Sequence, residues 1–223
     1  MMALSLPMPP GVVRAVRLGN DTRLAPVPAG WNLDELRGRL TEISGLSDSS
    51  CLTQAFGVVL DAQHQEEPVV WVTRQESTFF PLDAWCSGVD LNALVVVRLL
   101  DEDAILRATD RLARSGGFGL VVADLSSSSD KATALGRAQP PYVPMAAQAR
   151  LRSLAHRHDM AVVFLTRKTR KQPSLGSMIS LRAEASRSRN NDGLFSCVLN
   201  VLKDKNRGPG WTHDEVVRGP DGL

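Results

Sequence analysis

Residues 40–53 read Leu40-Thr41-Glu42-Ile43-Ser44-Gly45-Leu46-Ser47-Asp48-Ser49-Ser50-Cys51-Leu52-Thr53. The first part, residues 40–44, is a short run of the kind that predicts a buried strand. From about residue 52 to residue 63 the apolar positions follow helical periodicity, which predicts a helix. Between the two lies a turn rich in glycine and serine. A strand, a tight turn and a helix in this order form the opening unit of an α/β fold.

The same alternation of strands and helices continues along the chain. Strands are predicted at residues 69–73, 94–97, 120–123, 161–166 and 194–203, and helices near residues 82–87, 101–114 and 145–158. The strand segments are apolar on both faces, which is typical of parallel strands covered by helices on both sides. The sequence therefore predicts an α/β fold with a mostly parallel sheet flanked by helices on both faces.

The length of 223 residues suits one domain with appended arms. Five prolines predict an extended arm over residues 1–30, and residues 31–209 are expected to form the domain. Serine, proline and basic residues predict long loops over residues 126–144 and 167–193. Glycine and proline predict an irregular tail over residues 210–223.

Charge is unevenly distributed in this chain. Its net charge is only +2, but residues 164–207 carry +7 and the remainder −5, so a polyanion should meet the C-terminal third. With 43% hydrophobic and 22% charged residues, disorder throughout and coiled coils are excluded. The longest apolar run, residues 160–165, is too short to span a membrane, and the prolines of the arm do not fit a secretory signal. We therefore expect a cytoplasmic protein without a membrane partner.

The three cysteines and four histidines show no disulfide or metal-ligand spacing. We expect no metal and no cofactor.

The turn after residue 44 can be compared with a phosphate-binding P-loop, G-x-x-x-x-G-K-[ST]. Gly45 occupies the first position, but Ser50 replaces the second glycine, Cys51 the lysine, and Leu52 the hydroxyl residue. Only the amides of a helix N-terminus remain to attract an anion, and an ordinary serine-rich turn is the alternative.

Several segments resemble the RecA recombinase family, in the same order along the chain. Residues 38–45 resemble the segment that leads into the family's P-loop, residues 112–124 its helix and Walker B strand, and residues 164–166 its sensor strand. Residues 202–209, Leu-Lys-Asp-Lys-Asn-Arg-Gly-Pro, resemble its late K-N-[KR] turn. The Gly-Pro ending resembles the ImuA family, RecA-related accessory proteins of bacterial SOS mutagenesis cassettes. The resemblance covers about residues 31–209 and implies a RecA-like core.

The family's catalytic residues are mostly replaced. The acidic residue that activates water falls on Gln75, although Glu76 is adjacent, and the phosphate-sensing glutamine falls on Arg167. Asp124 resembles the Walker B aspartate, with a loop-capping role as the alternative. The resemblance therefore implies a degenerate nucleotide site that does not hydrolyse ATP.

A cluster of basic residues follows the predicted sensor strand, where one of the two DNA-facing loops of the RecA family lies. Its density of positive charge suits phosphate neutralisation, so we expect it to bind single-stranded DNA. A solvated loop and a protein-binding surface are the alternatives. The residues of this cluster are Arg167, Lys168, Arg170, Lys171, Arg182, Arg187 and Arg189.

Partners are implied by the resemblance alone. Lys203, Lys205 and Arg207 match the late turn through which RecA-family protomers reach the nucleotide of the next subunit, so they are expected to bind RecA recombinase. The ImuA family further implies an inactive Y-family polymerase relative and a replicative-type polymerase in translesion synthesis. Two alternatives remain. One is a SulA-like cell-division inhibitor, and the other is a divergent DNA-dependent ATPase that uses Glu76, Asp124 and Lys203 or Lys205.

Overall fold

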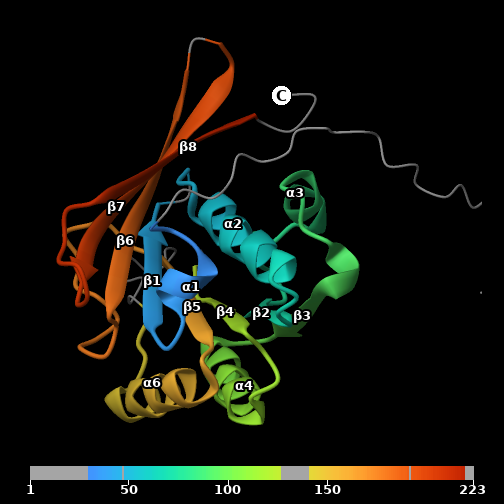
Figure 1. The fold of residues 1–223 in the computed structure, drawn as a ribbon, viewed down its shortest axis with the longest axis vertical. Helices are drawn as coiled ribbons and strands as arrows, with labels where there is room; N and C mark the ends of the chain where they lie inside the picture. The colour runs from blue at the N-terminus through green and yellow to red at the C-terminus, as the bar shows by residue number, and fades with distance from the viewer. Residues whose placement is uncertain (1–29, 47, 127–140, 191, 219–223) are drawn as a thin grey trace, which may run out of the picture.

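The computed structural model describes residues 30–46, 48–126, 141–190 and 192–218 (Figure 1). Its strands are β1 Leu40–Gly45, β2 Val69–Arg74, β3 Leu94–Leu99, β4 Leu120–Asp124, β5 Ala161–Arg167, β6 Leu181–Arg189, β7 Leu194–Asp204 and β8 Thr212–Arg218. Its helices are α1 Leu33–Leu36, α2 Cys51–His64, α3 Pro81–Cys86, the 3₁₀ helix η1 Leu91–Ala93, α4 Glu102–Ser115 and α6 Met145–His158. The strands and longer helices predicted from the sequence are confirmed, most within one or two residues at each end.

The strands of the described residues form one eight-stranded sheet in the order β3-β2-β4-β5-β1-β6-β7-β8. The pairings from β3 to β6 are all parallel, whereas β7 and β8 extend the sheet with antiparallel pairings. The predicted α/β fold with a mostly parallel sheet is therefore confirmed. Because β1, β2, β4 and β5 run in the same direction, the residues that follow them lie at one edge of the sheet.

Helices cover both faces of the sheet. Figure 1 shows α2 over one face and α4 and α6 over the other. On the α2 face, Phe56, Trp71 and Phe79 pack with ring centroids 5.1 to 6.0 Å apart. On the other face, Ile105 of α4 and Leu151 of α6 are buried in a second core cluster. Two apolar layers, one on each side, fix the plane of the sheet.

Two predicted irregular segments contain strands. The predicted loop over residues 167–193 includes β6, and the predicted irregular tail over residues 210–223 includes β8. Both strands pair antiparallel with β7, which satisfies the backbone groups that face β7 even though many of the side chains are polar and exposed. The arm predicted over residues 1–30 and most of the loop predicted over residues 126–144 lie outside the described residues.

Among the described helices, none combines the length and the apolar character needed to cross a membrane.

Candidate functional site

The turn between β1 and α2 is filled by its own side chains. Gly45 is buried, and a Cβ atom at this position would lie 2.4 Å from Ser49 Oγ and 2.8 Å from Cys51 Sγ. The Ser49 amide donates to the Leu46 carbonyl at 3.0 Å, and the Ser49 hydroxyl lies 3.2 Å from the Cys51 sulfur. Glycine is needed here because the two side chains pack directly over it. Space that an open phosphate cradle would leave free is therefore occupied.

Ser50 and Cys51 face the protein interior. The Ser50 hydroxyl donates to the Ser186 carbonyl of β6 at 2.7 Å, which ties the turn to the neighbouring strand. Burial raises the pKa of the Cys51 thiol to about 11, and the charges of Asp124 and Glu184 act in the same direction. A neutral thiol thus stands where a P-loop has its lysine.

Leu52, at the position of the magnesium-binding hydroxyl, is partly buried and packs against the core cluster on the α2 face. It supplies an apolar contact in place of an oxygen ligand.

Asp124 ends β4 and is fully buried at the same edge of the sheet. One carboxylate oxygen accepts from the Thr73 hydroxyl at 3.0 Å, and the other accepts from the Ser126 amide at 3.0 Å and its hydroxyl at 2.5 Å. Burial raises the pKa of Asp124, and the hydrogen bonds from Ser126 and Thr73 only partly offset this effect. Asp124 therefore holds the ends of β2 and β4 together, as a loop-capping residue would.

The remaining nucleotide-site candidates lie on the surface at this edge. Gln75 and Glu76 follow β2 and are exposed. The backbone amide of Gln75 donates to the Leu99 carbonyl at 2.8 Å, which ties residue 75 to the end of β3. Arg167, at the end of β5, is exposed and in register with Gly45 of β1. The structure thus brings Gly45 and Arg167 together at this edge of the sheet, with a glutamine at position 75.

Two residues of the predicted DNA-binding cluster are buried, which corrects that part of the prediction. Lys168 is 3% and Arg182 is 5% exposed. The Lys168 ammonium lies 3.0 Å from Glu42 Oε1, and Arg182 Nε lies 3.9 Å from Glu42 Oε2. Glu42 also accepts from the Thr166 hydroxyl at 3.0 Å and the Leu175 amide at 2.9 Å. Lys168 and Arg182 therefore neutralise an interior carboxylate and cannot reach a phosphate.

The other members of the cluster are exposed along β5, β6 and the segment between them: Arg167, Arg170, Lys171, Arg187 and Arg189. Arg187 and Arg189 are two residues apart on β6, so they lie on the same face of the strand. Both guanidinium groups lie over the ring of Phe195 on β7, at 5.0 and 6.0 Å from its centroid. An aromatic ring thus accompanies two of the arginines, a combination suited to single-stranded nucleic acid. The sequence did not indicate this ring, because Phe195 lies on the neighbouring strand β7 and meets the arginines only when the two strands pair.

Contacts within the chain also engage the late turn. Lys205 donates to the Ser177 carbonyl at 2.6 Å, and Arg207 pairs with Glu35. Lys203 is partly buried, and its pKa is lowered by burial and by the neighbouring charge of Lys205. Arg207 and Lys205 nevertheless remain on the surface, where a partner could compete for them.

Asp204 organises this turn from inside. Its carboxylate lies 2.5 Å from the Arg39 guanidinium and accepts from the Trp211 indole at 3.1 Å and the Asn206 amide at 2.9 Å. Although burial alone would raise the pKa of Asp204, these donors lower it. Asp204 and Glu42 were missed as interior anchors. A charged residue inside an apolar strand, as in residues 40–44, is the signal that could have found Glu42.

Within the described parts of the chain, no group of three or more histidine, cysteine, aspartate or glutamate side chains could hold a metal ion.

No family model matches the chain. It is similar to Protein RecA of Chlorobium chlorochromatii, with 36% identity over 88 residues, which is 40% of this chain and 25% of the relative. Protein RecA of Symbiobacterium thermophilum is 34% identical over 122 residues, 54% of this chain and 34% of the relative. The matches thus span about a quarter to a third of the curated relatives' length. With the mostly parallel sheet flanked by helices, this partial similarity supports a RecA-like family and a RecA-like core for the chain.

Proposed function

We propose that this chain is an accessory protein of the bacterial DNA-damage response that acts by binding and does not hydrolyse ATP. The observation that carries the proposal is the turn after β1. There a buried neutral thiol, Cys51, stands in place of the phosphate-binding lysine, and Ser49 and Cys51 fill the space over Gly45. The connection to DNA damage rests on the partial similarity to RecA.

Phosphoryl transfer depends on positioned charges, because catalysis there is mostly electrostatic. A P-loop supplies open backbone amides, a lysine and a magnesium-binding hydroxyl. Here the Ser50 hydroxyl bonds to β6, Leu52 packs against the core, and Asp124 has a raised pKa, which disfavours the ionised form that a metal needs. These differences act together, so restoring any one of these residues would not be enough to restore hydrolysis.

The proposed partner is the RecA recombinase itself. In the RecA family, basic residues of the late turn reach the nucleotide of the adjacent subunit, and Lys203, Lys205 and Arg207 match that turn. A protomer that docks this way on a true RecA subunit, but has no working site of its own, would end a filament. Resemblance to the ImuA family adds an inactive Y-family polymerase relative and a replicative-type polymerase as partners in translesion synthesis.

The nucleotide half of the proposal is tested by steady-state ATPase assays and calorimetric titration of the purified chain with Mg–ATP. We expect no hydrolysis above background and binding no tighter than roughly millimolar, about −4 kcal/mol. Magnesium-dependent turnover that disappears in Asp124→Asn would instead identify the chain as a divergent ATPase.

The partner half is tested by direct binding to RecA and by RecA strand exchange. Wild-type protein in excess should bind RecA and reduce strand exchange, and the variant Lys203→Ala, Lys205→Ala, Arg207→Ala should do neither. A matched control is Arg107→Ala, Arg111→Ala, Arg152→Ala, which removes the same charge from exposed positions on α4 and α6. Equal behaviour of the wild type and the late-turn variant would overturn this docking surface.

A further inference from the structure

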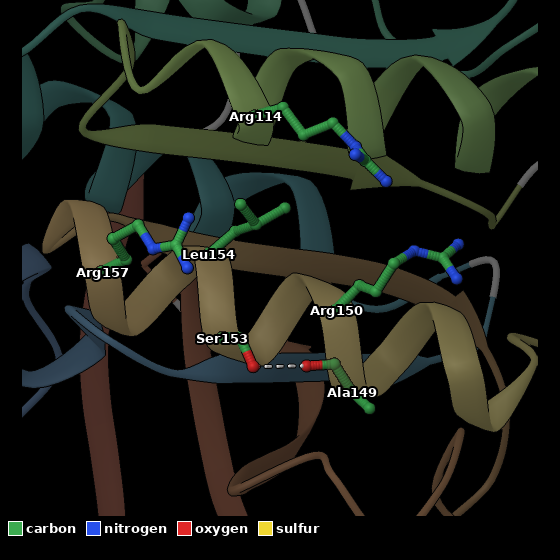
Figure 2. Close-up of a pocket in the computed structure, with 6 residues that line it drawn as sticks. All are labelled: Arg114, Ala149, Arg150, Ser153, Leu154 and Arg157. Carbon is green, nitrogen blue, oxygen red and sulfur yellow. Dashed lines mark hydrogen bonds between the residues drawn. The ribbon is translucent and has the colours of Figure 1, made fainter.

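Helices α4 and α6 lie side by side on the face of the sheet opposite α2 (Figure 1), and a groove lies between them (Figure 2). Its volume is about 350 Å³, and it is shallow and largely open to solvent. Arg114 comes from α4 and the other lining residues come from α6. The lining residues are Arg114, Ala149, Arg150, Ser153, Leu154 and Arg157. We call this feature the α4–α6 groove.

Positive charge surrounds the α4–α6 groove. Arg114 and Arg150 share the carboxylate of Asp110, with Nε–O distances of 2.7 and 3.2 Å. Burial alone would raise the pKa of Asp110, but the two arginines lower it, so this clasp between the helices is ionised. Arg157 is exposed and has no ion pair within the described residues. The groove lining thus carries three guanidinium groups, two of which share one carboxylate, and α6 itself contains no acidic residue.

The floor of the α4–α6 groove is apolar. Leu154 is only partly buried and, as Figure 2 shows, points toward α4 between Arg150 and Arg157. The hydroxyl of Ser153 donates to the Ala149 carbonyl at 3.1 Å, so it is already used inside the helix. An occupant would therefore meet an apolar strip along its middle and guanidinium groups along its sides.

We infer that the α4–α6 groove is a docking surface for an acidic, amphipathic helical segment of a partner protein. An apolar side chain of the occupant would cover Leu154, and flanking carboxylates would form bidentate pairs with the arginines. Arg150 and Arg157 are two helical turns apart, about 10 Å along the axis, which matches acidic residues spaced two turns apart on the occupant. This inference does not depend on the proposed function.

A nucleic-acid strand fits the α4–α6 groove less well. Its phosphates would use the arginines, but the lining contains no aromatic residue on which bases could stack. It would also leave the apolar floor at Leu154 uncovered. Charge complementarity combined with an apolar floor therefore favours the acidic amphipathic segment.

The test uses a fluorescent synthetic peptide of about 14 residues, a typical helix length, with leucines on one face and glutamates beside them. Fluorescence anisotropy with the full chain should show saturable binding. We expect Arg157→Glu to weaken it at least tenfold. Arg152→Glu is the matched control, because it makes the same charge change on α6 where the guanidinium lies 3.8 Å from Met178 Sδ, outside the lining. It should leave the affinity within a factor of two.

A second peptide, with serines in place of the leucines, separates the apolar floor from charge alone and should bind at least tenfold more weakly. Equal binding of the two peptides, or competition by a single-stranded oligonucleotide at lower concentration than the leucine peptide, would overturn the inference in favour of a general polyanion surface. Unchanged affinity in Arg157→Glu, with its thermal unfolding like that of the wild type, would also overturn it.

Discussion

Asp124 carries an electrostatic cost at the end of β4, because burial raises its pKa despite donors from Ser126 and Thr73. Below the ordinary aspartate pKa of about 3.9, Asp124 is protonated in both the folded and the unfolded state, so its charge does not affect the free energy of unfolding. As the pH rises through that value, the unfolded state ionises first, so the stability contributed by this residue falls until the pH passes the folded-state pKa.

We therefore predict that the melting temperature of Asp124→Asn, measured relative to the wild type between about pH 4 and pH 7, increases as the pH rises above about 4. Thermal unfolding followed by circular dichroism across this range measures the difference. Asp48→Asn, at an exposed position in the turn after β1, is the control and should give a flat difference. A difference for Asp124→Asn that shrinks as the pH rises would contradict the assignment of the cost to a buried charge.

The three cysteines should differ sharply in reactivity. Cys86 is exposed, whereas Cys51 and Cys197 are buried. The raised pKa of Cys51, about 11, leaves almost no thiolate at pH 8. Labelling with iodoacetamide, followed by mass spectrometry, should modify Cys86 first and Cys51 only after denaturant is added. Rapid labelling of Cys51 in Cys86→Ser would show that the turn after β1 opens, contrary to its filled packing.

At the scale of elements, a buried ion pair fastens the segment after β5 to the sheet. Residues 168–180 contain no helix or strand, yet Lys168 pairs with Glu42 of β1 in the interior. Breaking a buried ion pair typically costs about 3–5 kcal/mol, and Arg182, 3.9 Å from Glu42, would still compensate part of the charge left in the interior. We therefore predict a loss of about 3 kcal/mol or less for Lys168→Met in urea unfolding, and a smaller loss when Glu42→Gln is added.

The control for this prediction is Lys171→Ala, which lies in the same segment but is exposed and should stay within about 0.5 kcal/mol of the wild type. A Lys168→Met variant as stable as this control would place the charge of Lys168 in solvent.

Sequence patterns predicted the elements whose hydrophobic periodicity is strong. The bounds predicted for α6 agree with the structure, and β2, β4 and β5 were found because both of their faces are largely apolar. Strand β6 escaped prediction because four of its last residues are exposed and it contains three arginines. Its stability as a strand comes from backbone pairing with β1 and β7, which no local pattern records.

The candidate site was predictable in position but not in detail. Strand, glycine and helix placed the turn after β1 correctly, and the replacements at Ser50 and Cys51 are plain in the sequence. That Ser50 bonds to a carbonyl of β6 depends on a contact 136 residues away. Burial of Lys168 against Glu42 likewise spans 126 residues. Long-range pairing, and not residue type, decides which basic residues remain available to a ligand.

At the scale of the whole molecule, Arg187 and Arg189 give β6 an exposed basic surface, which is the part of the predicted DNA-binding cluster that we test. If Arg187 and Arg189 contact phosphates, Arg187→Glu, Arg189→Glu should weaken single-stranded DNA binding and flatten its dependence on salt. Arg107→Glu, Arg111→Glu on α4 makes the same charge change and should have little effect. Electrophoretic mobility shifts at several salt concentrations measure both. Equal losses in the two variants would indicate a response to net charge alone.

The fastening of residues 168–180 also has a kinetic consequence. The Leu175 amide donates to the buried carboxylate of Glu42 at 2.9 Å, and the Ser180 amide donates to the Leu40 carbonyl at 2.9 Å. Exchange of an amide hydrogen with deuterium requires an opening that breaks its hydrogen bond. Opening here would strip an interior carboxylate of its partners, so these two amides should exchange as slowly as those of β1. A segment without regular secondary structure would then open as slowly as the strand that it packs against, and would belong to the most slowly exchanging part of the described structure.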